Sequence, residues 1–116
     1  MDMLLIETME SYNEYLQKLP DGCQKVADYI RQDNLSDAFK GILQFSEGVA
    51  WLINANQLLE KNSFVNQLNP EKINEYLNEI NSGLQMQDYV IVADMFEYEI
   101  KPFFEESSFY DLSERK

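Results

Sequence analysis

The sequence of 116 residues contains no histidine. This absence removes the side chain that most often acts as a general base, and with it every Ser-His-Asp or Cys-His arrangement and every zinc site that needs an imidazole. It also removes the Glu-x-x-His pairs with which ferritin-like helical bundles hold two irons. The sequence therefore predicts a protein that is not an enzyme, with no catalytic residues, no metal site and no cofactor.

Glycine, proline and cysteine are scarce as well. Four Gly and three Pro provide little turn chemistry for an all-β fold. The glycines are isolated from one another in the sequence, which excludes a Gly-rich phosphate loop. Cys23 is the sole cysteine, so no intramolecular disulfide can form. Because no His or second Cys lies near it in the sequence, we interpret it as an inert thiol.

Basic residues are outnumbered by acidic ones. Nine Lys and Arg stand against twenty-one Asp and Glu, and the formal net charge is −12. A field of that sign repels phosphate groups, so we expect neither a nucleic acid nor an anionic membrane as a partner. Two interpretations of the acidic excess remain open: it keeps the protein soluble, or it steers a basic protein partner to the surface.

Long hydrophobic runs are missing. No apolar run approaches the roughly 20 residues that a membrane helix needs, and Asp94 interrupts the candidate segment YVIVADMF at 89–96. The first ten residues, MDMLLIETME, lack the basic region and the long apolar region of a secretory signal. We therefore expect a cytoplasmic protein.

The sequence does contain apolar residues at helical spacing. The apolar face of a first helix consists of Leu5, Met9, Tyr12, Leu16 and Leu19. Pro20 disfavours a helical residue before it, so we expect this helix to be kinked or split there before it resumes to about residue 34. Ser36 is the expected N-cap of a second helix. We interpret Asn56, the one polar residue on that helix's apolar face, as a hydrogen-bonded core amide.

Three small residues form a line on the second helix. Gly41, Gly48 and Ala55 stand seven residues apart, so they lie on one side of it. A glycine inside a helix costs about 1 kcal/mol relative to alanine, and two of them indicate that another helix approaches closely. That helix belongs either to the same chain or to a second copy. Trp51 lies off the main apolar face, and we expect it to contact a second neighbour.

Two further helices complete the pattern. Asn69-Pro70 is a strong helix start, with Asn as the N-cap and Pro at the first helical position. A fourth helix, from about Gln87 to Glu105, has so wide an apolar arc that we expect it to be the most buried, and bent at Pro102. Four helices with short connections predict an all-α fold, an antiparallel four-helix bundle. We expect one domain at 1–106 and a polar C-terminal tail at 107–116.

Four side chains of the fourth helix are candidate ligand-binding residues: Asp94, Glu97, Tyr98 and Glu99. Asp94 interrupts an apolar run, and it shares a helix face with Tyr98, four residues later. One interpretation is a hydrogen-bond cluster within or between helices. The other is a carboxylate-lined ligand or metal site, since hard cations accept oxygen ligands.

Two segments carry a resemblance to known proteins. DYVIVADMFEYEIKPFFE, from Asp88 to Glu105, resembles a recurring pattern in small helical proteins of Gram-positive bacteria with no assigned function, and EGVAWL, from Glu47 to Leu52, fits the same pattern. The resemblance implies a helical bundle in a bacterial cytosol, and it brings no catalytic residues with it. At the level of the fold alone, a small acidic bundle also looks like the chaperones that hold flagellar or secreted subunits.

Three hypotheses on function remain. We favour a non-enzymatic protein–protein interaction module, a small chaperone or adaptor with an unidentified protein partner, because the charge is strongly acidic and the chain has more large apolar residues than a minimal bundle needs. The second hypothesis is a bundle that binds a small apolar ligand or a metal around Asp94, Glu97, Tyr98 and Glu99. The third is self-association, a homo-oligomer in which the line of Gly41, Gly48 and Ala55 serves the interface.

Overall fold

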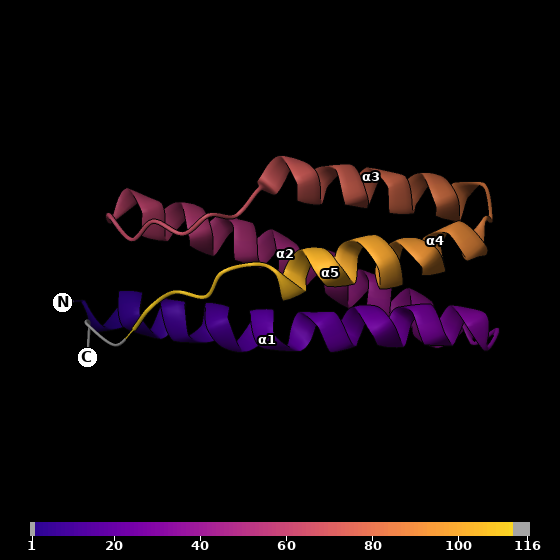
Figure 1. Cartoon of the computed structure of the whole chain (residues 1–116), viewed down its shortest axis with the longest axis horizontal. Helices are drawn as coiled ribbons and strands as arrows, with labels where there is room; N and C mark the ends of the chain where they lie inside the picture. Colours follow the sequence, from indigo (N-terminus) through magenta and orange to yellow (C-terminus); the bar gives the residue numbers. More distant parts are fainter. Residues whose placement is uncertain (1, 113–116) are drawn as a thin grey trace.

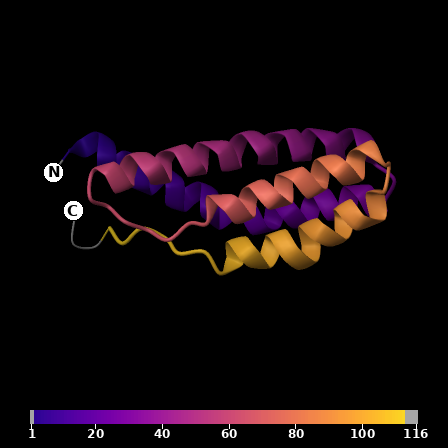
Figure 2. The same ribbon diagram turned by 90° about the horizontal axis from the view of Figure 1, so that it is seen from above.

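The computed structural model describes residues 2–112. Its elements are α1 (Met3–Arg31), α2 (Leu35–Lys61), α3 (Pro70–Gln85), α4 (Tyr89–Met95), a π-helical turn η1 (Phe96–Ile100) and α5 (Lys101–Glu105). The last three follow one another without a break, so the chain runs alternately up and down in four helical segments (Figure 1, Figure 2). No strand forms within residues 2–112, and the predicted all-α antiparallel four-helix bundle is confirmed.

The first helix continues through Pro20. α1 is one helix from Met3 to Arg31, so of the two outcomes expected at Pro20, a kink or a split, the split does not occur. Proline removes one backbone donor, which leaves the carbonyl of Leu16 without its usual helical partner. Leu19 on one side of the proline and Cys23 on the other are both buried on the same apolar face. Continuous packing on both sides of Pro20 thus outweighs one missing hydrogen bond.

The N-cap of the second helix lies two residues before the expected one. Asn34, not Ser36, is the N-cap of α2: its side-chain oxygen accepts a hydrogen bond from the amide of Asp37, and its side-chain amide donates to the Asp37 carboxylate at 2.8 Å. The preceding turn is tight, because Asp33 takes a positive φ of 60° and the amide of Asn34 donates to the carbonyl of Tyr29. Both residues belong to the types that tolerate such a turn.

The last helical segment widens before its proline. In η1 the amide of Lys101 donates to the carbonyl of Phe96, five residues back, one turn ahead of the bend expected at Pro102. The segment is also less buried than expected, because Val90 and Ile91 are exposed. α4 packs on α1 and α3, and its remaining side faces solvent.

Two of the four helical segments cover only half of the bundle. α1 and α2 run along its whole length, whereas α3 and the last helical segment lie side by side at one end (Figure 1, Figure 2). At the other end, residues 62–69 and 106–112 follow the long helices as extended chain. The core continues there, because Tyr110 is buried and its ring meets that of Tyr12 edge to face, with centroids 4.9 Å apart. The packed domain thus extends past residue 106, and residues 113–116 of the expected tail lie outside the described residues.

Three asparagine side chains attach these extended segments. Asn56, the buried amide of α2, donates to the carbonyl of Asn66 and to the hydroxyl of Tyr110, both at 3.0 Å. Asn13 on α1 accepts from the amide of Tyr110 and donates to its carbonyl. Asn66 donates to the carbonyl of Ser108. The amides provide the partners that strands or helices would otherwise give to this backbone, and Asn56 is the hydrogen-bonded core amide that the sequence predicted.

No helix within residues 2–112 combines the length and the apolar character that crossing a bilayer requires.

Replacing Asn56 with Ala should lower the free energy of unfolding by about 1–3 kcal/mol, since the change leaves the Asn66 carbonyl and the Tyr110 hydroxyl without their buried donor. Urea denaturation followed by circular dichroism measures the loss. Asn78→Ala is the matched control, because Asn78 is exposed on α3, and its replacement with a better helix former should leave stability unchanged or slightly higher. Equal effects of the two substitutions would contradict the role given to Asn56.

Candidate functional site

The structure places the four predicted ligand-binding residues on the surface, where Arg31 of α1 binds two of them. The Arg31 guanidinium donates to Asp94 at 3.0 Å and also donates to Glu97. It also lies over the ring of Tyr98, 5.9 Å from the centroid. Glu99 points elsewhere: it is exposed, and its backbone carbonyl accepts from the hydroxyl of Tyr76. The cluster links α1 to the last helical segment.

A glutamine extends this cluster inward. Gln24 of α1 donates to Glu97 at 3.0 Å and accepts from the ammonium of Lys101 at 3.1 Å. The hydrogen bond from Gln24, followed by that from Arg31, lowers the pKa of Glu97 from its ordinary value of 4.5 to about 2. The carboxylates already have partners within the chain, and residues 2–112 contain no group of three acidic or Cys side chains placed to hold a metal. The geometry is that of an interhelical hydrogen-bond cluster.

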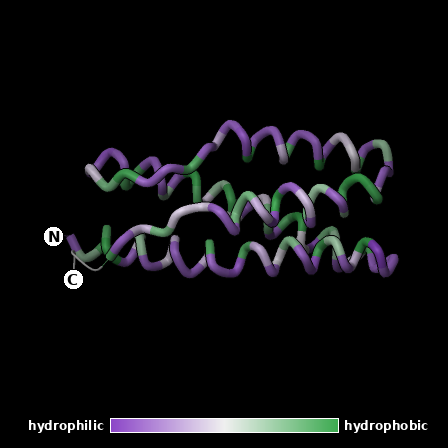
Figure 3. The backbone as a smooth tube through the Cα atoms, in the orientation of Figure 1, coloured by the Kyte–Doolittle hydropathy of each residue, from purple (hydrophilic) through white to green (hydrophobic). Residues whose placement is uncertain are grey.

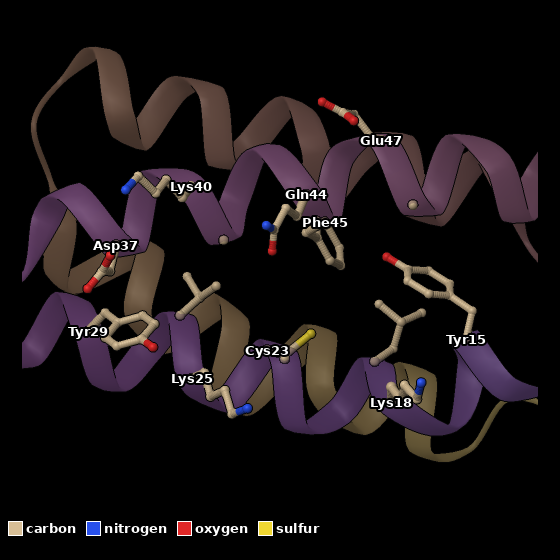
Figure 4. A pocket seen from close by; sticks show the side chains of 15 residues that line it. Tyr15, Lys18, Cys23, Lys25, Tyr29, Asp37, Lys40, Gln44, Phe45 and Glu47 are labelled. Carbon is tan, nitrogen blue, oxygen red and sulfur yellow. The ribbon is translucent and has the colours of Figure 1, made fainter.

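A groove lies on the other side of the molecule, between α1 and α2 (Figure 4). It has a volume of about 800 Å³ and is partly open to solvent. Its floor is apolar and includes Leu19, Val26 and Phe45, all buried. Cys23 is buried there too, and burial raises the pKa of its thiol to about 12, so the sulfur is protonated at neutral pH, as expected of an inert thiol.

The glycines of α2 shape this groove. A Cβ atom on Gly48 would overlap the Tyr15 hydroxyl, and one on Gly41 would lie 2.8 Å from a methyl group of Val26. The close approach thus occurs within the chain, with α1 as the other helix. Ala55, the third residue of the line, is buried in the core. Trp51 lies beside the line, partly exposed, and its ring meets that of Tyr15 edge to face at 6.4 Å.

A third feature is a group of exposed apolar side chains at the end of the bundle where α2 begins and α3 turns into α4. We call it the apolar corner; it comprises Phe39, Leu43, Met86, Val90 and Ile91, all exposed. The ring of Phe39 lies 6.2 Å from that of Tyr89, the first residue of α4, and so connects the two helices. Figure 3 shows the start of α4 as a hydrophobic stretch at this end.

Acidic residues surround the apolar corner. Five acidic residues belong to the segments at this end, two of them in the turns before α2 and α4 and three in the adjoining helices. They are Asp28, Asp33, Asp37, Asp88 and Asp94, and the basic residues of the same segments are Arg31 and Lys40. Because Arg31 is engaged by Asp94 and Glu97, the free charge around the apolar corner is negative.

Sequence reasoning did not find the apolar corner or the polar side chains of the groove. Val90 and Ile91 belong to an apolar arc that predicts burial. They are exposed because no helix packs against their side of α4. Tyr15 of the groove depends on the register between α1 and α2. The spacing of Gly41 and Gly48 indicates that a helix approaches, but it does not say which residue of that helix fills the space.

Comparison with known proteins yields one match. The model of a family described as a domain of unknown function, DUF8042, matches residues 7–108. No curated protein and no solved structure matches the chain. The match agrees with the predicted resemblance to proteins without an assigned function, whereas their Gram-positive origin stays a prediction.

The depressed pKa of Glu97 makes the cluster sensitive to acid. Glu97 binds a proton less readily in the folded protein than in the unfolded chain. Its stabilising contribution is therefore complete above about pH 4.5 and is lost as the pH falls toward 2. Arg31→Met should raise the pKa of Glu97 toward 4.5, and Gln24→Met should act in the same direction. Carboxyl-carbon NMR titration measures both shifts. Lys61→Met, at the C-terminal end of α2, is the control. An unchanged pKa of Glu97 in the Arg31→Met protein would contradict the ion pair between Arg31 and Glu97.

The two glycines at positions 22 and 48 should respond to alanine in opposite ways. Gly22 has open space around its missing Cβ, so Gly22→Ala should stabilise the protein by up to about 1 kcal/mol through helix propensity. Gly48→Ala displaces the Tyr15 hydroxyl and should destabilise it by about 1–3 kcal/mol. Thermal unfolding measures both. A stabilising Gly48→Ala would mean that Tyr15 does not occupy the space above this glycine.

Proposed function

The chain belongs to the DUF8042 family, and we propose that it is a non-enzymatic protein–protein interaction module, a small chaperone or adaptor of the bacterial cytoplasm. The apolar corner is the observation that carries this proposal. Val90 is 71% exposed and Met86 is 72% exposed, whereas most of the large apolar side chains of the chain belong to a continuous core or pack against it. Exposed apolar side chains gathered within a polar rim are typical of protein-binding sites.

The acidic rim indicates the chemistry of the partner. Asp33 and Asp88 stand at the two turns that flank the apolar corner, and the whole chain has a net charge of −12. Complementary charge steers association and suppresses wrong partners, and exposed charges act over about 10 Å at 0.1 M salt. The partner we propose is therefore a basic amphipathic segment, whose apolar face covers the apolar corner while its Lys and Arg side chains meet the aspartates.

Self-association through the same surface is the competing possibility. Two copies would bring two acidic rims together, and like charges at an interface disfavour binding. A basic partner avoids this cost, so we favour it over a second copy of the chain.

A basic amphipathic peptide should bind the protein at low salt and more weakly as salt is raised. Val90→Gln should weaken that binding about tenfold, a loss of about 1.4 kcal/mol, because it places a polar group in the apolar corner without changing the charge. Fluorescence anisotropy of the labelled peptide measures the affinity. Val65→Gln is the matched control, since Val65 is 74% exposed but lies in the 62–69 segment at the opposite end.

Equal effects of the two valine substitutions would remove the apolar corner from the proposal. Binding of an acidic peptide of the same apolar pattern would contradict the role given to the aspartates. Sedimentation of the unliganded protein as a dimer, abolished by Val90→Gln, would replace the basic partner with a second copy.

A further inference from the structure

The groove between α1 and α2 contains polar groups that have no partner within residues 2–112. The hydroxyl of Tyr15 points into the groove, as does the side-chain amide of Gln44 (Figure 4), and neither makes a hydrogen bond to another described residue. Burial raises the pKa of Tyr15, so its hydroxyl remains a donor at neutral pH. Polar groups of this kind, few and placed along an apolar wall, orient a ligand in a binding site.

The groove also gathers positive charge in an acidic protein. Lys18, Lys25 and Lys40 line it, three of the nine basic residues of the chain, and none of them forms an ion pair within the described residues. Figure 4 shows the ammonium group of Lys25 directed away from α2, so Lys18 is the cation that serves the Tyr15 end. Two acids line it as well. Asp37 keeps its negative charge at the end near Tyr29, where it accepts a hydrogen bond from Asn34, and Figure 4 shows the carboxylate of Glu47 directed away from the groove.

The dimensions suit an elongated molecule. The groove follows α1 from Tyr15 to Tyr29, fourteen residues, which at a rise of about 1.5 Å per residue is roughly 21 Å. Its volume of about 800 Å³ lies in the range of small-molecule sites. Between the ends Leu19, Val26 and Phe45 give the groove an apolar floor, and Gly22 leaves open space beside it.

We propose that this groove binds a free long-chain carboxylate, with the carboxylate group between Tyr15 and Lys18 and the hydrocarbon chain along Leu19 and Val26. The Tyr15 hydroxyl donates to one carboxylate oxygen and the Lys18 ammonium pairs with the negative charge. This end is favoured over the opposite one because Asp37 lies at the latter and repels an anion. The groove shares no residue with the apolar corner, so this site stands or falls independently of the proposed function.

Dodecanoate, used below its micelle concentration, is the probe. The emission of Trp51, the sole tryptophan, reports binding because its ring contacts Tyr15, and calorimetry gives the stoichiometry. We expect one dodecanoate per chain, and at least tenfold weaker binding of dodecan-1-ol, which lacks the charge. Lys18→Gln should weaken dodecanoate binding at least fivefold and leave dodecan-1-ol unaffected. Lys61→Gln, at the C-terminal end of α2, should change neither.

A second pair of variants tests the path of the hydrocarbon chain. Gly22→Leu places a side chain in the open space of the groove and should abolish dodecanoate binding while circular dichroism and thermal unfolding show an intact bundle. Gly22→Ala, which adds a single methyl group, should retain most of it. Undiminished binding to the Gly22→Leu protein, equal binding of the acid and the alcohol, or no binding at all would overturn the proposal. Each of these results leaves the peptide-binding experiment at the apolar corner unaffected.

Discussion

The fold depends on hydrogen bonds from asparagine side chains to the backbone of its two extended segments. A four-helix bundle ordinarily satisfies its backbone polar groups within the helices, and only side chains meet between them. Here α3 and the last helical segment are half as long as the bundle, so two stretches of extended chain complete it. Their backbone groups need partners because unpaired buried groups are costly. Asn13, Asn56 and Asn66 provide them, and the aromatic pair of Tyr12 and Tyr110 fills the space that remains.

The sequence predicts the helices well because their signals are local. The N-cap at Asn69 and the proline after it place the start of α3 where the structure has it. The interpretation of Asn56 also holds, since a polar residue on an apolar face needs a partner wherever the chain puts it. Local reasoning leaves both a kink and a split open at Pro20. The proline costs one hydrogen bond, and the packing of α1 against α2 and the last helical segment, which the sequence does not reveal, keeps the helix in one piece.

The candidate sites were harder to predict, because each one depends on which helices become neighbours. Asp94 and Glu97 are a possible ligand site on one helix, but they become an ion-paired cluster once Arg31 of α1 lies beside them. The apolar pattern predicts that Val90 is buried, but its side chain is exposed because α4 contacts other helices only on its other sides. The groove combines residues of two helices whose register no spacing in the sequence encodes. The fold can therefore be predicted without the register between the helices, but the sites cannot.

The contact between Asn13 and Tyr110 joins residues 97 positions apart in the sequence. During synthesis on a ribosome the chain grows from its N-terminus, so α1 and α2 can pair as a helical hairpin long before residue 110 emerges from the exit tunnel. The half of the bundle that relies on the asparagines then stays open until nearly the whole chain has been made. Throughout that interval the ring of Tyr12 lacks its aromatic partner. A nascent hairpin with such exposed apolar surface is the kind of folding intermediate that chaperones bind.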